Sequence, residues 1–144
     1  MTQSSVAVQR RPNRTMGPNH DTFWEYCNQG EFRLQKCNNC GKMQFPPSPL
    51  CPECLSSEMT WTRINGTGKI ISHVTFYRQY FQECPAPWHA ILVQIDEGPS
   101  FVMNPKDQDV PIAELKAGTP VKLAFVDAED GSGPFKLPVW ETAK

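Results

Sequence analysis

Two C-x2-C pairs in the first half of the chain constrain its fold more than any other feature. Ten residues separate them, from Cys37 and Cys40 to Cys51 and Cys54. In each pair the backbone of a tight turn directs both sulfurs toward one point, so two opposing turns present four thiolates as a tetrahedron. Zinc accepts this geometry at metal–sulfur distances of about 2.3 Å. We therefore expect one zinc ion in a ribbon held by these four cysteines.

The expected zinc is structural. A catalytic zinc keeps one coordination position open, whereas four cysteines fill the shell. Metal binding can contribute about 10 kcal/mol to the folding of a segment that is too small to fold alone. Iron is the alternative, because the same four thiolates hold iron in rubredoxin-like sites. Gly41 follows the first pair, where a positive φ is often needed, but Leu55 occupies the matching place after the second pair.

The other cysteines and the histidines form no second recognisable motif. Cys27 is expected to be a small buried hydrophobe, and Cys84 lies in the proline-containing segment 79–88. A nucleophilic Cys84 assisted by His73 or His89 is an alternative, but no sequence pattern places a base beside it. We expect both histidines to be structural. Paired carboxylates, a P-loop and a nucleophile motif are absent from the sequence, so we do not expect catalysis by this chain alone.

The amino-acid composition is that of a globular chain of 144 residues. Its fourteen prolines favour strands and turns over long helices. Residues 1–80 carry nine Lys/Arg and five Asp/Glu, whereas residues 81–144 carry five and ten. An acidic second half argues against a nucleic-acid groove there.

No run of about 18 apolar residues exists in the sequence. An export signal would require an apolar run after Arg10 and Arg11, and none follows them. We therefore expect no membrane span and a cytoplasmic location, where cysteines stay reduced.

The chain is expected to have three regions. Residues 1–18 lack hydrophobic periodicity, which predicts a flexible arm that could order on a partner. Residues 19–60 are expected to hold a short helix and then the zinc ribbon. Residues 61–144 are expected to be all-β, with about five strands, which suits a small closed barrel better than a sandwich. The expected strands are Trp61–Ile64, Lys69–Tyr77, Ala90–Asp96, Phe101–Asn104 and Val121–Val126.

The expected helix is short and unusually aromatic. Asn19 or Asp21 can cap its start, Gly30 can end it, and Phe23 and Trp24 lie on it. A helix of this length is marginal alone in water, so it needs a surface to lie on. Two alternatives are consistent with the sequence: the helix packs on its own domain, or it docks onto another subunit.

The order of helix, four-cysteine ribbon and small barrel resembles the acyl-CoA-associated zinc-ribbon/OB-fold family, formerly a domain of unknown function. The resemblance covers about residues 20–141. The segments that carry it include Phe23-Trp24, Phe32-Arg33-Leu34-Gln35, Cys37-Asn38-Asn39-Cys40-Gly41, Phe45-Pro46-Pro47, Cys51-Pro52-Glu53-Cys54, Gly66-Thr67-Gly68-Lys69-Ile70, Pro87-Trp88, Asp96-Glu97-Gly98-Pro99 and Leu137-Pro138-Val139-Trp140. It implies a mainly β fold, in which an N-terminal helix and a rubredoxin-like zinc ribbon precede a five-stranded OB-fold barrel.

The resemblance also implies a function. Members of the family are usually small non-catalytic subunits of thiolase-like enzymes, which cleave or form carbon–carbon bonds in acyl-CoA thioesters. A CoA or acyl-CoA ligand and a heterotetramer with a thiolase-like subunit are therefore expected. Aromatic and cationic side chains of barrel loops suit CoA, and the candidates are Arg78, Tyr80, Phe81, Trp88 and Lys106. The alternative function is a nucleic-acid-binding module, because zinc ribbons and OB barrels also bind single strands.

Overall fold

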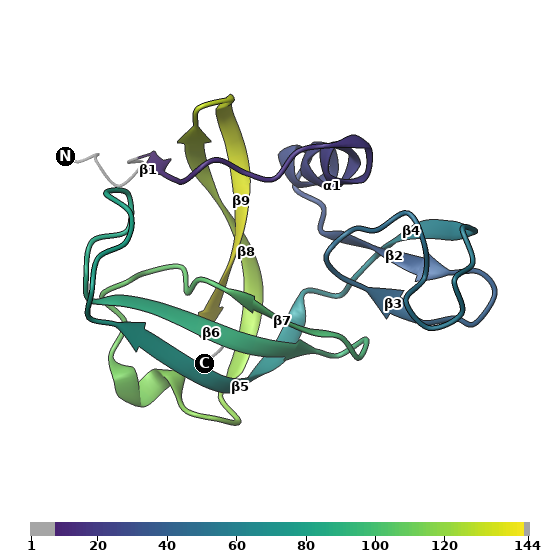
Figure 1. Ribbon diagram of the computed structural model, residues 1–144. Coiled ribbons are helices and arrows are strands. Elements are labelled where there is room, and N and C mark those ends of the chain that lie inside the picture. Colours follow the sequence, from purple (N-terminus) through teal and green to yellow (C-terminus); the bar gives the residue numbers. More distant parts are fainter. Residues whose placement is uncertain (1–7, 143–144) are drawn as a thin grey trace.

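The computed structural model describes residues 8–142 and is shown in Figure 1. Within these residues the chain forms a three-stranded sheet and a six-stranded sheet, and an α-helix lies beside them. The elements in chain order are β1 (Gln9–Arg10), α1 (Pro18–Asn28), β2 (Arg33–Cys37), β3 (Met43–Gln44), β4 (Met59–Arg63), β5 (Thr67–Phe76), β6 (Trp88–Ile95), β7 (Ser100–Met103), the 3-10 helix η2 (Ile112–Leu115), β8 (Pro120–Asp130) and β9 (Gly133–Thr142). The expectation of a mainly β fold, with one helix, a ribbon and an OB-type sheet, is confirmed.

The three-stranded sheet builds the cysteine ribbon, and its strand order is β3-β2-β4. Strand β4 contains Trp61, which we expected in the first strand of the barrel. It pairs antiparallel with β2 instead, with Trp61 opposite Gln35, and the Trp61 ring lies 5.9 Å from that of Tyr26 on α1. A strand is present here as expected, but it lies in the ribbon sheet and not in the larger sheet. Residue composition indicates a strand but not the sheet that receives it.

The six-stranded sheet has the order β1-β8-β5-β6-β7, and β9 pairs with β8. Strand β5 pairs with β6 along its length, with a register shift between Ile70 and Ser72. It meets β8 only through Thr67–Lys69, so β8 soon leaves the edge of β5. An isolated parallel bridge between Pro105 and Trp140 links the end of β7 to β9. The sheet therefore curls as in an OB-fold, but a continuous ladder does not close it.

Strand β9 was not among the expected strands, and β8 is longer than expected. The reason is proline. Pro134 and Pro138 lie within β9, where they stand opposite Glu129 and Phe125 of β8. Proline has no backbone N–H to donate, so it is tolerated where one side of a strand has little hydrogen-bonded pairing. Among residues 8–142, β9 pairs with no second strand on that side apart from the single bridge at Trp140, and its Lys136 N–H donates to the Asn28 side chain.

Helix α1 begins with Pro18 in its first turn and has Gly17 as its N-cap residue. The Asp21 carboxylate accepts a hydrogen bond from the Gly17 N–H at 3.2 Å, so Asp21 supports the helix start from inside the first turn. Gly30 has a φ of +80°, and its N–H donates to the Cys27 carbonyl, as expected of a residue that ends a helix. The buried face of α1 lies on its own chain, against β9 and β2.

Aromatic rings join the helix, the ribbon and the larger sheet into one core. Phe23 of α1 lies 5.3 Å from Phe32, the residue before β2. Phe32 stacks on Phe101 of β7 with centroids 5.8 Å apart, and Phe45, which follows β3, lies 4.8 Å from Phe101. Phe101 in turn lies 6.5 Å from Trp140 of β9. Phe101 is thus the ring at which ribbon and sheet meet.

The segment before α1 runs along the β8–β9 hairpin (Figure 1). Residues 1–7 of the expected flexible arm lie outside the described residues. Residues 8–17, which we call the N-terminal strap, instead have fixed partners: β1 pairs parallel with β8, with Gln9 opposite Ala128 and Arg10 opposite Glu129. No helix within residues 8–142 has the length and hydropathy of a membrane-spanning segment.

Truncating Phe101 tests the role of the aromatic core. Phe101 is 7% exposed and Val102, beside it on β7, is 64% exposed. Phe101→Ala is expected to lower the free energy of unfolding by about 3–5 kcal/mol, because it removes the ring that joins ribbon and sheet. Val102→Ala is the matched control and is expected to change it by about 0.5 kcal/mol or less. Denaturant titration measures both, and equal losses would contradict this account.

Candidate metal centre and ligand pocket

The four predicted ligand cysteines lie together in the ribbon. Their Sγ atoms all lie within 4.8 Å of one another, with Cys37 and Cys54 3.5 Å apart and Cys40 and Cys51 3.6 Å apart. Four sulfurs at bonds of about 2.3 Å from one ion are about 3.8 Å from each other. The sulfurs therefore stand at the spacing that a tetrahedral metal ion requires, and the residues present fit a closed four-thiolate site.

The two cysteine turns have the same backbone geometry. The Gly41 N–H donates to the Cys37 carbonyl at 2.9 Å, and the Leu55 N–H donates to the Cys51 carbonyl at 2.8 Å. Gly41 has a φ of +79° and Leu55 a φ of +63°. Leu55 thus adopts the left-handed conformation that glycine adopts in the first turn, although its Cβ makes this conformation unfavourable.

The pKa values of the thiols respond to neighbouring donors and to each other. A hydrogen bond from the Asn39 side chain, with a second from the Ser56 N–H, lowers the pKa of Cys54 to about 6. The Cys40 N–H lowers the pKa of Cys37. The Lys42 N–H also lowers the pKa of Cys40, but desolvation and hydrogen bonds with the other sulfurs outweigh it and raise this pKa to about 12. Four adjacent thiolates need a bound cation to coexist.

Replacing one ligand tests the metal centre. Cys40 is the exposed ligand, so Cys40→Ser changes the coordination without opening the core. We expect wild type to hold one zinc per chain by elemental analysis, and Cys40→Ser to lose most of the metal and melt at a lower temperature. Cys84→Ser, outside the ribbon, keeps the metal. Visible absorption would indicate iron, and melting that chelators leave unchanged would contradict a structural metal.

Leu55 gives a second test of the ribbon. A left-handed conformation costs a residue with a Cβ about 1–2 kcal/mol, whereas glycine loses about 0.5–1 kcal/mol of chain entropy on folding. Leu55→Gly is therefore expected to raise the free energy of unfolding of the metal-bound chain by about 0.5–1 kcal/mol. Leu50→Gly, at an exposed leucine without a positive φ, is expected to lower it. A loss in both variants would contradict strain at Leu55.

Four of the five predicted CoA-binding residues line one pocket at the end of the larger sheet. These four are Arg78, Tyr80, Phe81 and Trp88, and the pocket volume is about 290 Å³. The loop between β5 and β6 supplies four of its nine lining residues. In an OB-fold the loop between the first two strands is part of the ligand-binding face. The remaining lining residues are Arg11, Pro12, Phe76, Cys84 and Ala90. We call this the aromatic pocket.

The aromatic pocket is locally ordered and its rings remain accessible. The Trp88 indole N–H donates to the Asn104 side chain at 3.1 Å, and the Arg11 guanidinium lies 5.2 Å from the centre of the Trp88 ring. The Phe76 and Tyr80 rings meet edge to face at 6.3 Å. Tyr80 is 68% exposed and Phe81 is 54% exposed. The pocket thus offers ring surfaces and two guanidinium groups, and no carboxylate is among the described residues that line it.

The geometry gives Cys84 no sign of activation as a nucleophile. Burial raises the pKa of the Cys84 thiol, and the nearby Arg11 lowers it to a lesser extent. The thiol is therefore mostly protonated at neutral pH. His89 is buried, and its Nδ1 lies 2.8 Å from the Thr75 hydroxyl oxygen. These contacts agree with the structural role expected for His89.

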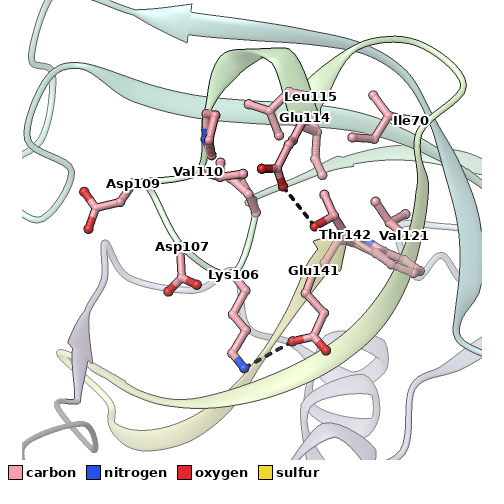
Figure 2. Close-up of a pocket in the computed structure, with 14 residues that line it drawn as sticks. Ile70, Lys106, Asp107, Asp109, Val110, Glu114, Leu115, Val121, Glu141 and Thr142 are labelled. Atoms are coloured by element: carbon pink, nitrogen blue, oxygen red, sulfur yellow. Dashed lines mark hydrogen bonds and ion pairs between the residues drawn. The ribbon is translucent and has the colours of Figure 1, made fainter. Parts of the chain in front are cut away.

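Lys106, the fifth candidate, does not line the aromatic pocket. It lines a separate cavity of about 370 Å³, shown in Figure 2, where its ammonium group forms an ion pair with Glu141 at 3.1 Å. Four carboxylates line this cavity, those of Asp107, Asp109, Glu114 and Glu141. One ammonium does not offset four carboxylates, so the cavity disfavours a phosphate-bearing ligand. Lys106 also lines a hollow of about 270 Å³ that it shares with Trp88.

Sequence reasoning missed Arg11 and Phe76 as lining residues of the aromatic pocket. Phe76 is in an expected strand next to the candidate loop, so its position beside Arg78 was a usable signal. Arg11 is different, because the strap reaches the pocket only by pairing with β8, more than 100 residues away in the chain. No local sequence pattern predicts a pairing between strands so far apart in the chain.

A four-cysteine ribbon that leads into an OB-type sheet defines the class of zinc-ribbon/OB-fold proteins. Comparison with family models agrees: residues 24–60 match the ChsH2 rubredoxin-like zinc ribbon domain, and residues 61–126 match the ChsH2 C-terminal OB-fold domain. A DUF35 domain-containing scaffold protein of Pyrococcus furiosus is 31% identical over 108 residues, which are 70% of this chain and 74% of that protein. The chain therefore belongs to the ChsH2-type DUF35 family.

Two further similarities concern enzymes. A protein of Thermomonospora curvata named "Probable enoyl-CoA hydratase alpha subunit" is 27% identical over 135 residues, and this chain spans 40% of its length. The solved structure "Ltp2-ChsH2(DUF35) aldolase" contains a chain that matches with a TM-score of 0.78 and 25% identity, covering 92% of this chain and all of that one. A DUF35 family structure from Sulfolobus solfataricus matches with a TM-score of 0.56 and 18% identity, which shows the fold alone.

Proposed function

We propose that this chain is a non-catalytic zinc-binding subunit of a thiolase-type acyl-CoA enzyme, in which it helps to bind CoA or to assemble the enzyme. The observation that carries the proposal is the match, over nearly the whole chain, to the DUF35 chain of the Ltp2-ChsH2 aldolase. Relatives named scaffold proteins support the same role. The partner is then a thiolase-like catalytic subunit, in a heterotetramer located in the cytoplasm.

Zinc has a structural part in this proposal. With four thiolates in its shell, the ion keeps no open position for substrate. It holds the ribbon closed, and the ribbon in turn supports Phe32 and Phe45 against Phe101. Reactive chemistry on the acyl thioester is then left to the partner subunit, while this chain supplies a stable surface and a ligand pocket.

CoA fits the aromatic pocket by its chemistry. The adenine ring can stack on exposed aromatic side chains, and the phosphates suit the guanidinium groups of Arg11 and Arg78. At about 290 Å³, the pocket lies at the lower end of the range for small-molecule sites. It therefore takes one part of CoA, the nucleotide end, and leaves the pantetheine arm to extend toward a partner.

Direct CoA binding tests the pocket. Tyr80→Ala is expected to weaken CoA affinity about fivefold to a hundredfold, because one stacking contact is worth about 1–3 kcal/mol. Tyr77→Ala is the matched control, since Tyr77 is a 77% exposed aromatic of the same loop outside the pocket lining. Titration calorimetry measures both. Equal CoA affinity in the two variants would contradict CoA binding in the aromatic pocket. Tighter binding of a single-stranded oligonucleotide than of CoA would support the nucleic-acid alternative.

Assembly is tested separately from CoA binding. The chain and a thiolase-like subunit from the same organism are co-expressed, and light scattering coupled to size exclusion gives the mass of any complex. We expect one species that contains both chains, with acyl-CoA cleavage or condensation activity that falls when this chain is left out. Two separate peaks, with activity unchanged by adding this chain, would contradict the proposed role as a subunit.

A further inference from the structure

The N-terminal strap, residues 8–17, is held to the β8–β9 hairpin by strand pairing, hydrogen bonds and an ion pair. Besides the β1–β8 pairing, the Arg11 N–H donates to the Glu129 carbonyl at 2.9 Å. The Gly131 N–H donates to the Asn13 side-chain oxygen at 2.8 Å. The backbone on both sides of Pro12 is therefore held to the hairpin, which fixes the position of the strap relative to the sheet.

A buried ion pair between Arg14 and Asp130 also holds the strap to the hairpin. The Arg14 Nε donates to Asp130 Oδ2 at 2.8 Å, and their side chains are 10% and 0% exposed. The Arg14 guanidinium also lies 3.9 Å from the centre of the Phe135 ring and 5.2 Å from that of Trp24. Burial raises the pKa of Asp130, but hydrogen bonds from Arg14 and from the Ser132 N–H outweigh it and lower this pKa. The carboxylate is thus charged at neutral pH.

Arg11 lies three residues before this ion pair and extends into the aromatic pocket. Its guanidinium covers the Trp88 ring at 5.2 Å, and its Nη1 lies 3.7 Å from the Cys84 sulfur. A contact with a neutral thiol is weak, so the guanidinium keeps donors for a ligand. Arg78, across the same pocket, is the second cation of the lining.

We propose that Arg11 binds a phosphate group of the CoA-type ligand, and that the ion pair of Arg14 with Asp130 positions it. This inference rests on the proposed function. A guanidinium binds phosphate through two parallel hydrogen bonds, which requires a fixed orientation. The buried ion pair and the Asn13 contact supply that orientation from outside the pocket. Asp130 is therefore a positioning residue, and its effect on the ligand passes through Arg11.

The test compares neighbouring arginines of the strap. Arg11→Ala removes the pocket cation, whereas Arg10→Ala removes an arginine whose side chain is 76% exposed and paired with Glu129. We expect Arg11→Ala to weaken CoA affinity about tenfold or more, as loss of a charge-assisted hydrogen bond does, and to reduce the dependence of affinity on salt. Arg10→Ala is expected to leave both within about twofold. Arg11→Lys is expected to restore the salt dependence but only part of the affinity.

A double-mutant cycle tests the positioning role. Asp130→Asn is expected to weaken CoA affinity about threefold to tenfold in the wild-type chain and to add no further loss in the Arg11→Ala chain. If Asp130→Asn lowers the melting temperature too far for binding to be measured, Asn13→Ala replaces it, because it removes another contact between the strap and the hairpin. Metal content and melting temperature of every variant show whether its fold is retained.

The outcomes separate this inference from the function on which it rests. If wild type binds CoA and Arg11→Ala binds it as tightly as Arg10→Ala does, the role of Arg11 is wrong while the pocket stands. An unchanged salt dependence in Arg11→Ala also overturns the phosphate contact. Additive losses in the cycle overturn the positioning role of Asp130. If wild type binds no CoA, the pocket and the inference fall together.

Discussion

Ligation of one metal ion by four sulfurs is the constraint on which the rest of the structure depends. The cysteine turns have few hydrophobic residues of their own, and the ion replaces the core that they lack. By closing the turns, it holds β2 and β3 at a fixed separation. Phe32 and Phe45, at the ends of these strands, then reach Phe101 together. The ribbon is thus rigid enough to present two rings as a single packing surface to the larger sheet.

The sequence predicted those features that depend on residues close together in the chain. The cysteine spacing located the metal centre, and Gly30 located the end of α1. Features set by distant pairing escaped prediction. Trp61 carried a strand pattern, but its pairing with β2 rather than with the barrel is decided by the fold. The prolines of β9 concealed a ten-residue strand, because a proline is compatible with a strand only when the adjacent edge is free.

The average charge of each half of the sequence does not give the local charge of each hollow. The second half of the sequence is acidic, yet the fold gathers several of its carboxylates, including Asp107 and Asp109, around one cavity (Figure 2). The aromatic pocket receives its arginines from the other half, Arg11 from the strap and Arg78 from the loop after β5. The chain therefore carries two hollows of opposite electrostatic character, and only the three-dimensional arrangement shows that Lys106 lines the acidic cavity and not the aromatic pocket.

The attachment of the strap to the last hairpin has a consequence for folding order. Arg14 and Asp130 are 116 positions apart in the chain, and the ribosome makes the N-terminal end first. The strap therefore cannot form its contacts with the hairpin until β8 and β9 have been synthesised and paired. Contacts between such distant positions form late, because closing a long loop costs entropy before any contact compensates for it. The wall of the aromatic pocket that Arg11 and Pro12 supply is consequently put in place only after the β8–β9 hairpin has formed.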